Sequence, residues 1–167
     1  MAAGLRCLAL VTASAVALGL SASTEARSTG NACPMSHVLY RPYSGVDAQG
    51  LRTLPWIVSA PAGRFTAHLF FYGSVPWAKQ HLLGARIFTT RRPRDVNPKV
   101  LWITRTHGYQ QTLTMRGQRL DAPGSFADTY NGFGDYPSYV KVPAPGCWRV
   151  TVTTGHATGS VVFSATD

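Results

Sequence analysis

Apolar and polar residues alternate through the last twenty residues of the chain, and this alternation limits the fold more than any other feature. Trp148, Val150 and Val152 occupy every second position, with arginine and threonine between them. Successive side chains of a β-strand point to opposite faces, so the pattern predicts a strand with one buried face. Residues 155–159 contain two glycines, and residues 161–163 then resume the alternation. We expect a β-hairpin here, with a loop of about four or five residues.

Short β-type runs separated by turn residues continue this pattern towards the N-terminus. They cover residues 56–59, 64–72, 86–90, 99–106, 112–120 and 139–142. Long exposed helices draw on Glu, Lys and Ala, yet the chain has 16 Gly, 11 Pro and a single glutamate, Glu25. About seven to nine short strands predict an all-β protein, an immunoglobulin-like β-sandwich. A small barrel is the alternative, and one helix is expected over residues 75–83.

The N-terminus has the features of an export signal. Arg6 precedes an uncharged apolar run at residues 8–20. A helix of this length spans about 20 Å, less than the roughly 30 Å of a bilayer core. We therefore expect a signal peptide over residues 1–26, cleaved after Ala26 or, as an alternative, after Ser23. The mature protein would be periplasmic or extracellular and would have no transmembrane segment.

The exported part then divides into two regions. Residues 27–55 contain scattered Pro and Gly with no clear period, which predicts an irregular arm with one short edge strand near Val38. Residues 56–167 would form the β-sandwich domain.

Two cysteines remain once the signal, which contains Cys7, is removed. An even pair in an exported chain indicates a disulfide, here between Cys33 and Cys147. Closing so long a loop stabilises a fold by about 4–5 kcal/mol in the chain-entropy model. Lipidation of Cys33 is an alternative. Metal ligation by the two thiols is disfavoured, because neither lies in a Cys-x-x-Cys spacing.

Four segments carry a resemblance to a known family: residues 99–102, 117–121, 137–140 and 143–151. The last reads Pro-Ala-Pro-Gly-Cys-Trp-Arg-Val-Thr. Together they resemble a family of exported bacterial all-β proteins with a C-terminal Pro-x-x-Gly-Cys-Trp motif, over roughly the C-terminal 70 residues. The resemblance implies a secreted all-β domain and transfers no catalytic role. Within the motif, we expect Trp148 to face the core or to cover the disulfide.

A basic connection between two expected strands is the first candidate binding surface. The chain has a net charge of +9, and Arg91, Arg92 and Arg94 lie in this connection with only Asp95 opposing them. In an exported protein such a cluster suits an anionic cell-envelope polymer. The connection contains no aromatic residues for base stacking, so specific nucleic-acid recognition is not expected. The alternative interpretation is a solvated surface without a partner.

An aromatic, glycine-rich stretch at residues 122–137 is the second candidate. We expect it to be a long loop that presents Tyr130, Phe133 and Tyr136. Aromatic rings on such a loop can form a platform for a glycan or a pocket for another envelope protein. The alternative is that the rings fold back over an open end of the sandwich.

No motif in the sequence points to catalysis, a metal or a cofactor. A Gly-x-Ser-x-Gly nucleophile elbow is missing, and no two histidines have the spacing of a shared metal site. Met35 and His37 occupy alternate positions, and thioether and imidazole side chains are both copper ligands. The alternative interpretation is a flexible arm that binds no metal. The sequence therefore favours a non-enzymatic binding or interaction module. The alternative is a secreted hydrolase with His107 or His156 as its base.

Overall fold

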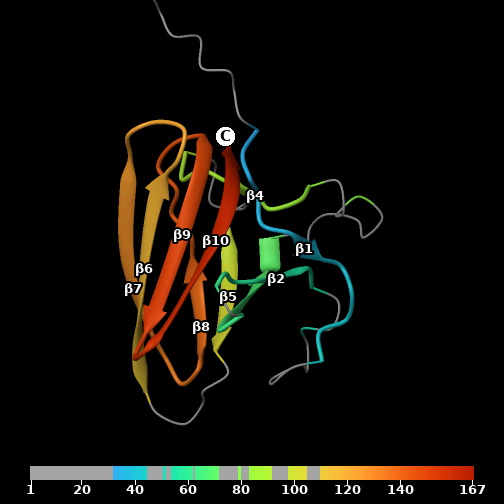
Figure 1. Cartoon of the computed structure of the whole chain (residues 1–167), viewed down its shortest axis with the longest axis vertical. Helices are drawn as coiled ribbons and strands as arrows, with labels where there is room; N and C mark the ends of the chain where they lie inside the picture. The colour runs from blue at the N-terminus through green and yellow to red at the C-terminus, as the bar shows by residue number, and fades with distance from the viewer. Residues whose placement is uncertain are drawn as a thin grey trace, which may run out of the picture. The chain divides into compact units, whose positions relative to one another are not determined.

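The computed structural model describes residues 32–44, 51, 54–61, 63–71, 79, 83–91, 98–104 and 110–167. Within these ranges ten strands form two five-stranded sheets (Figure 1). The first sheet has the order β1 (Val38–Leu39), β2 (Trp56–Val58), β3 (Phe65–Leu69), β5 (Lys99–Thr104) and β8 (Asp135–Tyr139). The second has the order β4 (Arg86–Phe88), β10 (Ala157–Thr166), β9 (Gly146–Thr154), β6 (Gln111–Arg119) and β7 (Ser125–Gly132). The predicted all-β fold with two sheets is confirmed.

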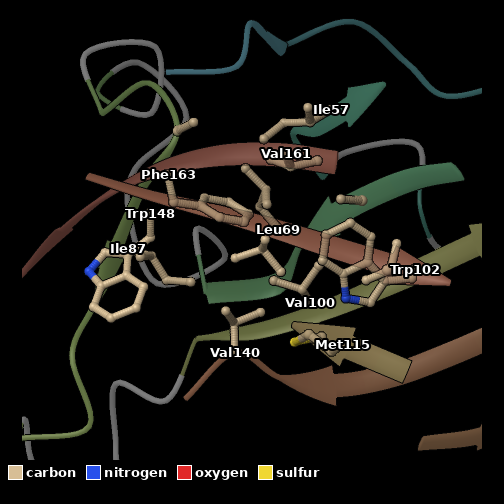
Figure 2. Packing of buried hydrophobic residues seen from close by; sticks show 14 of the residues in the cluster. Ile57, Leu69, Ile87, Val100, Trp102, Met115, Val140, Trp148, Val161 and Phe163 are labelled. Carbon is tan, nitrogen blue, oxygen red and sulfur yellow. The ribbon is translucent and has the colours of Figure 1, made fainter. Parts of the chain in front are cut away.

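The hydrophobic core lies between the inner faces of the two sheets. Figure 2 shows Trp102 and Val100 of the first sheet among Met115, Trp148 and Phe163 of the second. Along β6 and β9 of the second sheet the buried apolar positions alternate with polar ones, as expected when one face of a strand is buried. Trp148 is 1% exposed, and its indole nitrogen donates a hydrogen bond to the Ala144 carbonyl at 2.9 Å. The prediction that Trp148 faces the core is confirmed.

Hydrogen bonds join the two sheets along both sides of the core. On one side, Ala60 and Ser160 exchange two backbone hydrogen bonds of 2.9 and 2.7 Å. On the other, the Tyr139 amide of β8 donates to the Tyr130 hydroxyl of β7 at 3.3 Å, and the Tyr139 carbonyl oxygen lies 2.8 Å from the same hydroxyl. These contacts satisfy backbone groups of edge strands that would otherwise be unpaired.

The β9–β10 hairpin is tighter than the sequence suggested. Thr154 pairs with Ala157, which leaves only Gly155 and His156 in the turn. Gly155 has a φ of +50°, the left-handed conformation that two-residue hairpin turns use and that glycine adopts without strain. The expected loop of four or five residues is therefore wrong, because Ala157 and Thr158 already belong to the returning strand.

The aromatic stretch at residues 122–137 is also not the expected long loop. Most of it forms β7 and the start of β8, with a short turn at Phe133 and Gly134 between them. Gly117 of β6 lies in regular pairing with Phe126 and Val150. A Cβ atom on Gly117 would lie 1.9 Å from the Phe126 ring, so glycine is needed for that ring to cover β6.

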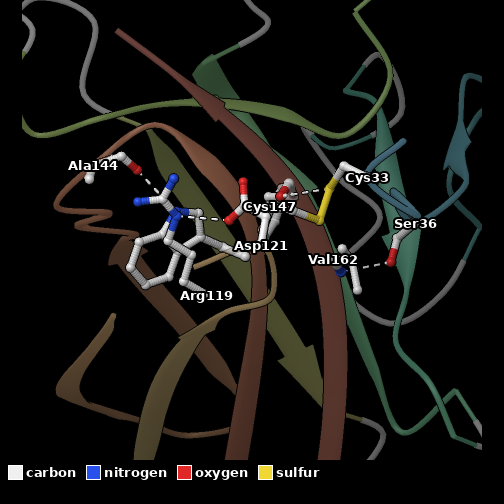
Figure 3. The surroundings of a disulfide bond; sticks show 9 residues. Cys33, Ser36, Arg119, Asp121, Ala144, Cys147 and Val162 are labelled. Carbon is white, nitrogen blue, oxygen red and sulfur yellow. Dashed lines mark hydrogen bonds and ion pairs between the residues drawn. A yellow bond between two sulfur atoms is a disulfide. The ribbon is translucent and has the colours of Figure 1, made fainter. Parts of the chain in front are cut away.

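The predicted disulfide is present between Cys33 and Cys147, whose Cα atoms are 5.4 Å apart (Figure 3). The disulfide ties the segment before β1 to the start of β9. Three residues further on, Ser36 continues this attachment: its amide donates to the Val162 carbonyl, and its hydroxyl accepts from the Val162 amide, both at 2.9 Å. The arm is thus fixed to the second sheet before it joins the first as β1.

Several expectations fall outside the described residues. They are the signal peptide over residues 1–26 and, apart from Lys79 and Leu83, the helix over residues 75–83. Among the residues that the structure describes, no helix has the length and apolarity needed to cross a membrane.

Candidate functional site

The three aromatic residues predicted to form a platform do not lie on one surface. Tyr136 is 1% exposed, and its hydroxyl hydrogen-bonds the Thr154 hydroxyl in the interior at 3.2 Å. Its predicted place in a binding surface is wrong, because it occupies an inward position of β8. Phe133 is 59% exposed at the turn before β8. Tyr130 is half-buried, with its hydroxyl turned to the strand edge.

The Tyr130 hydroxyl belongs to a polar network between the two sheets. It donates to the Asp128 carboxylate at 2.9 Å, which also accepts from Lys141 at 2.9 Å. Burial and the neighbouring carboxylate raise the pKa of Tyr130 to about 12, while the bond from Lys141 lowers the pKa of Asp128. These groups are already hydrogen-bonded to one another, so they join β7 to β8 and leave no open platform.

The basic connection is only partly described. Arg91 is exposed, and its amide donates to the Thr89 hydroxyl at 3.3 Å. Arg92 and Arg94 lie outside the described residues. The binding role of this connection stays a prediction.

A different region, the outer face of the first sheet, has the features of a binding site. Trp56, His68 and Leu101 lie side by side across β2, β3 and β5. Residues after β1 cover this face, and a second apolar cluster forms there around Tyr43, Trp56 and Ile103. The first sheet is therefore buried on both faces, which explains why the sequence of β3 is apolar at successive positions.

Three rings lock the covering segment onto this sheet. The centroid of Tyr43 lies 4.4 Å from that of His68 and 5.1 Å from that of Trp56, in both cases edge to face. Trp56 and His68 are parallel, with centroids 6.2 Å apart. The indole nitrogen of Trp56 donates to the Arg41 carbonyl at 3.0 Å. Edge-to-face pairs of this kind add to the free energy of burial.

His68 is fully buried beneath these rings. Its Nε2 hydrogen-bonds the Thr66 hydroxyl at 3.2 Å, whereas its Nδ1 is buried without a hydrogen-bond partner. Burial lowers the pKa of His68 to about 4, because the charged imidazolium would lose its hydration. The ring is thus neutral near pH 7 and closed to solvent, which excludes it as a base for an external substrate.

Beside the three rings lies a hollow of about 750 Å³. Its apolar wall includes Trp56, Val58 and Ile103, and hydroxyl groups come from Ser44, Thr66 and Thr104. Arg41 from the covering segment and Arg64, the residue before β3, also line it. The described lining residues include no aspartate or glutamate. We call this site the arginine hollow.

The two arginines give the arginine hollow its electrostatic character. The Arg41 guanidinium lies 5.8 Å from the centre of the Trp56 ring, a cation–π arrangement that fixes its position. Neither Arg41 nor Arg64 forms an ion pair with any residue that the structure describes. A guanidinium offers several donors in a planar fork that matches carboxylate and phosphate oxygens. The hollow is therefore suited to a ligand with an acidic group and an apolar face.

The sequence did not single out Arg41, Arg64 or their neighbours. The arginine hollow is assembled from the segment after β1 and from β2, β3 and β5, which are distant in sequence and share no motif. The one available signal was the apolar character of both faces of β3, which indicates that something covers its outer face.

The described residues offer little for catalysis or metal binding. They contain no group of three His, Cys, Asp or Glu side chains that could hold a metal ion. His156, one candidate base, lies exposed in the β9–β10 turn, and His107 is outside the described residues. Met35 and His37 are both exposed in the segment before β1.

Comparison with known proteins adds no assignment. No protein-family model, curated protein or solved structure matches this chain.

Proposed function

We propose that this protein is an exported, non-catalytic binding module that holds an acidic ligand in the arginine hollow. The single observation that carries the proposal is the convergence of Arg41 and Arg64 on a hollow whose described lining contains no carboxylate. Both guanidinium groups line one hollow and neither forms an ion pair with a described carboxylate, so an anion that enters the hollow is attracted by both.

The size and lining of the arginine hollow narrow the ligand class. Its volume of about 750 Å³ falls in the range of small-molecule sites. Apolar side chains and hydroxyls beside the arginines favour a sugar acid, a sugar phosphate or the acidic end of an envelope polymer. The ligand need not be a whole macromolecule, since the site is concave.

The compartment and the finer fold belong to the same proposal. A disulfide of this kind persists in oxidising compartments, which supports export by a signal peptide at residues 1–26 and a periplasmic or extracellular location. The two-sheet arrangement supports an immunoglobulin-like sandwich, with the domain taken to begin at β1 rather than at residue 56. Membership of the exported all-β family that the Gly-Cys-Trp motif resembles is part of this proposal.

The basic connection has a supporting role in this proposal. Arg91, Arg92 and Arg94 would attract an anionic envelope polymer over a longer range, without specific nucleic-acid recognition. The alternative partner for the basic connection is another envelope protein.

Calorimetric titration of the disulfide-bonded protein with glucuronate, glucose 6-phosphate and neutral glucose tests the proposal. We expect the acidic sugars to bind and glucose not to bind. Arg41→Gln with Arg64→Gln should weaken binding by at least about tenfold, since charged hydrogen bonds are lost. The matched control is Arg116→Gln with Arg149→Gln, which removes the same charge from the second sheet.

Two kinds of result would overturn the proposal. One is equal binding of glucose and the acidic sugars, or equal loss in the two variants, either of which would show that the arginine hollow does not select the anion. The other is chemical turnover of a bound sugar phosphate, which would contradict a non-catalytic role.

A further inference from the structure

The outer face of the second sheet carries regular rows of hydroxyl groups. The pairing of β7, β6, β9 and β10, which lie side by side in Figure 1, places threonine on all four strands in one row. That row consists of Thr129, Thr114, Thr153 and Thr158. In the next row, Arg116 of β6 pairs with Thr151 of β9, which pairs with Ser160 of β10. We call this surface, on strands β7, β6, β9 and β10, the hydroxyl face.

The spacing on the hydroxyl face is set by the sheet itself. Neighbouring strands are about 4.8 Å apart, and side chains on one face recur about every 6.7 Å along a strand. Some hydroxyls pair across strands, as Thr153 does with Thr158 at 3.1 Å and Thr151 with Ser160 at 2.8 Å. The hydroxyls of Thr114 and Thr129 make no hydrogen bond within the described part of the chain. The result is a grid of fixed donors and acceptors.

The chemistry of the hydroxyl face argues against several kinds of partner. The large exposed apolar side chains of the described residues are Met35, Val58, Leu120, Phe133 and Tyr139, and none of them points outward from these four strands. A protein partner needs an apolar centre, a bilayer surface needs inserted apolar side chains, and single-stranded nucleic acid needs aromatic stacking. A hydrated polymer fits better.

The charges of the hydroxyl face select the kind of polymer. Arg116 and Arg149 are its charged residues, on adjacent strands and one row apart. Both are exposed, and neither forms an ion pair with a described residue. They are complementary to a chain with acidic groups at intervals, while threonine hydroxyls can bond to sugar hydroxyls between those groups.

We infer that the hydroxyl face binds a linear polysaccharide that carries carboxylates. The sugar hydroxyls exchange hydrogen bonds with the threonine row, and the carboxylates lie at Arg116 and Arg149. This interaction goes beyond the proposed function, since it uses the opposite sheet and an extended ligand. It does not depend on the arginine hollow.

Retention of the disulfide-bonded protein on immobilised polygalacturonate tests this inference. Three double variants are compared: Arg116→Gln with Arg149→Gln, Thr114→Val with Thr153→Val, and Lys79→Gln with Arg86→Gln, which are two exposed cations outside both proposed sites. The first should weaken binding by at least about tenfold, through the loss of charged hydrogen bonds. The second should weaken it about three- to tenfold with net charge unchanged, since Val keeps the shape of Thr without its hydroxyl. The third removes as much charge as the first but at neither proposed site, and it should change binding by less than about threefold.

Polyphosphate separates sugar recognition from charge alone. This linear polyanion has no sugar hydroxyls, so the threonine variant should bind it as well as the unmodified protein does. Circular dichroism and melting temperature confirm that each variant folds. Equal losses on polygalacturonate for the Arg116 and Arg149 pair and for the Lys79 and Arg86 pair would overturn the inference, because net charge would explain the binding. A threonine variant with unchanged retention would also overturn it.

Discussion

The outer faces of the two sheets differ sharply, although their inner faces share one core. On the first sheet, Trp56 and His68 are covered by the segment that follows β1. On the second, threonine and arginine side chains face outward along β6 and β9. A covered face can hold a hollow of fixed shape, because packed side chains define its walls. The open face instead presents regular rows of polar side chains. The two faces therefore suit different ligands.

The largest expected effect concerns the bond that holds the covering segment. Replacing Cys33 and Cys147 together by serine should lower the free energy of unfolding by about 4–5 kcal/mol, since the bridge closes a loop with a sequence separation of 114. Urea unfolding with and without reductant measures this. A loss below about 1 kcal/mol would mean that the arm stays attached without the bridge.

Truncating one side chain on each outer face is the most direct test of the difference between the two faces. Trp56→Ala should cost about 3–5 kcal/mol, because a large buried ring and its packing on Tyr43 and His68 are lost. Thr153→Ala, on the hydroxyl face, should change the free energy of unfolding by less than about 1 kcal/mol. Thermal unfolding of both variants gives the difference. Similar costs at the two positions would refute the contrast between the faces.

Acid should weaken the covered face in particular. His68 has a pKa of about 4 in the folded protein and 6.5 as its ordinary value. Between these values the unfolded chain binds the extra proton, so stability is complete above pH 6.5 and falls as the pH drops towards 4. The loss should approach about 3 kcal/mol.

The control for this acid effect is His68→Phe, which keeps a ring between Tyr43 and Trp56 but cannot be protonated. Chemical unfolding from pH 4 to 7.5 should show a steeper dependence for the unmodified protein than for this variant. Parallel curves would mean that His68 is not the group responsible.

A smaller effect is expected at Gly117, inside the second sheet. In Gly117→Ala the new Cβ would meet the Phe126 ring, so the ring must shift at a cost of about 1–3 kcal/mol. Adding Phe126→Leu should recover part of this cost by making room. Unfolding of the single and double variants gives the coupling. Full additivity would show that the ring does not limit this position.

The sequence revealed most strands of both sheets and missed one in each, β8 of the first and β7 of the second. Strict alternation at Trp148, Val150 and Val152 predicted β9 and its inward tryptophan, because one face is buried and the other is wet. Glycine and proline hid β7 and β8, since these residues usually mark loops. Local composition could not show that Gly117 makes room for Phe126, a contact between neighbouring strands.

The arginine hollow could not be predicted from the sequence, for a related reason. Arg41 and Arg64 line the same hollow only because the segment after β1 folds across β2 and β3. Long-range packing of this kind leaves no spacing motif. Tyr136 illustrates the opposite error: it was predicted in an exposed loop, but β8 places every second side chain in the core.

The central claim is that the covered face carries the binding site for an acidic small ligand. Amide chemical shifts of isotope-labelled, disulfide-bonded protein, followed during titration with glucuronate, test it directly. The account predicts saturable shifts at Arg41, Tyr43 and Thr66, with the amides of Thr114 and Thr153 unchanged. Shifts confined to the second sheet, or spread evenly over the protein, would contradict it.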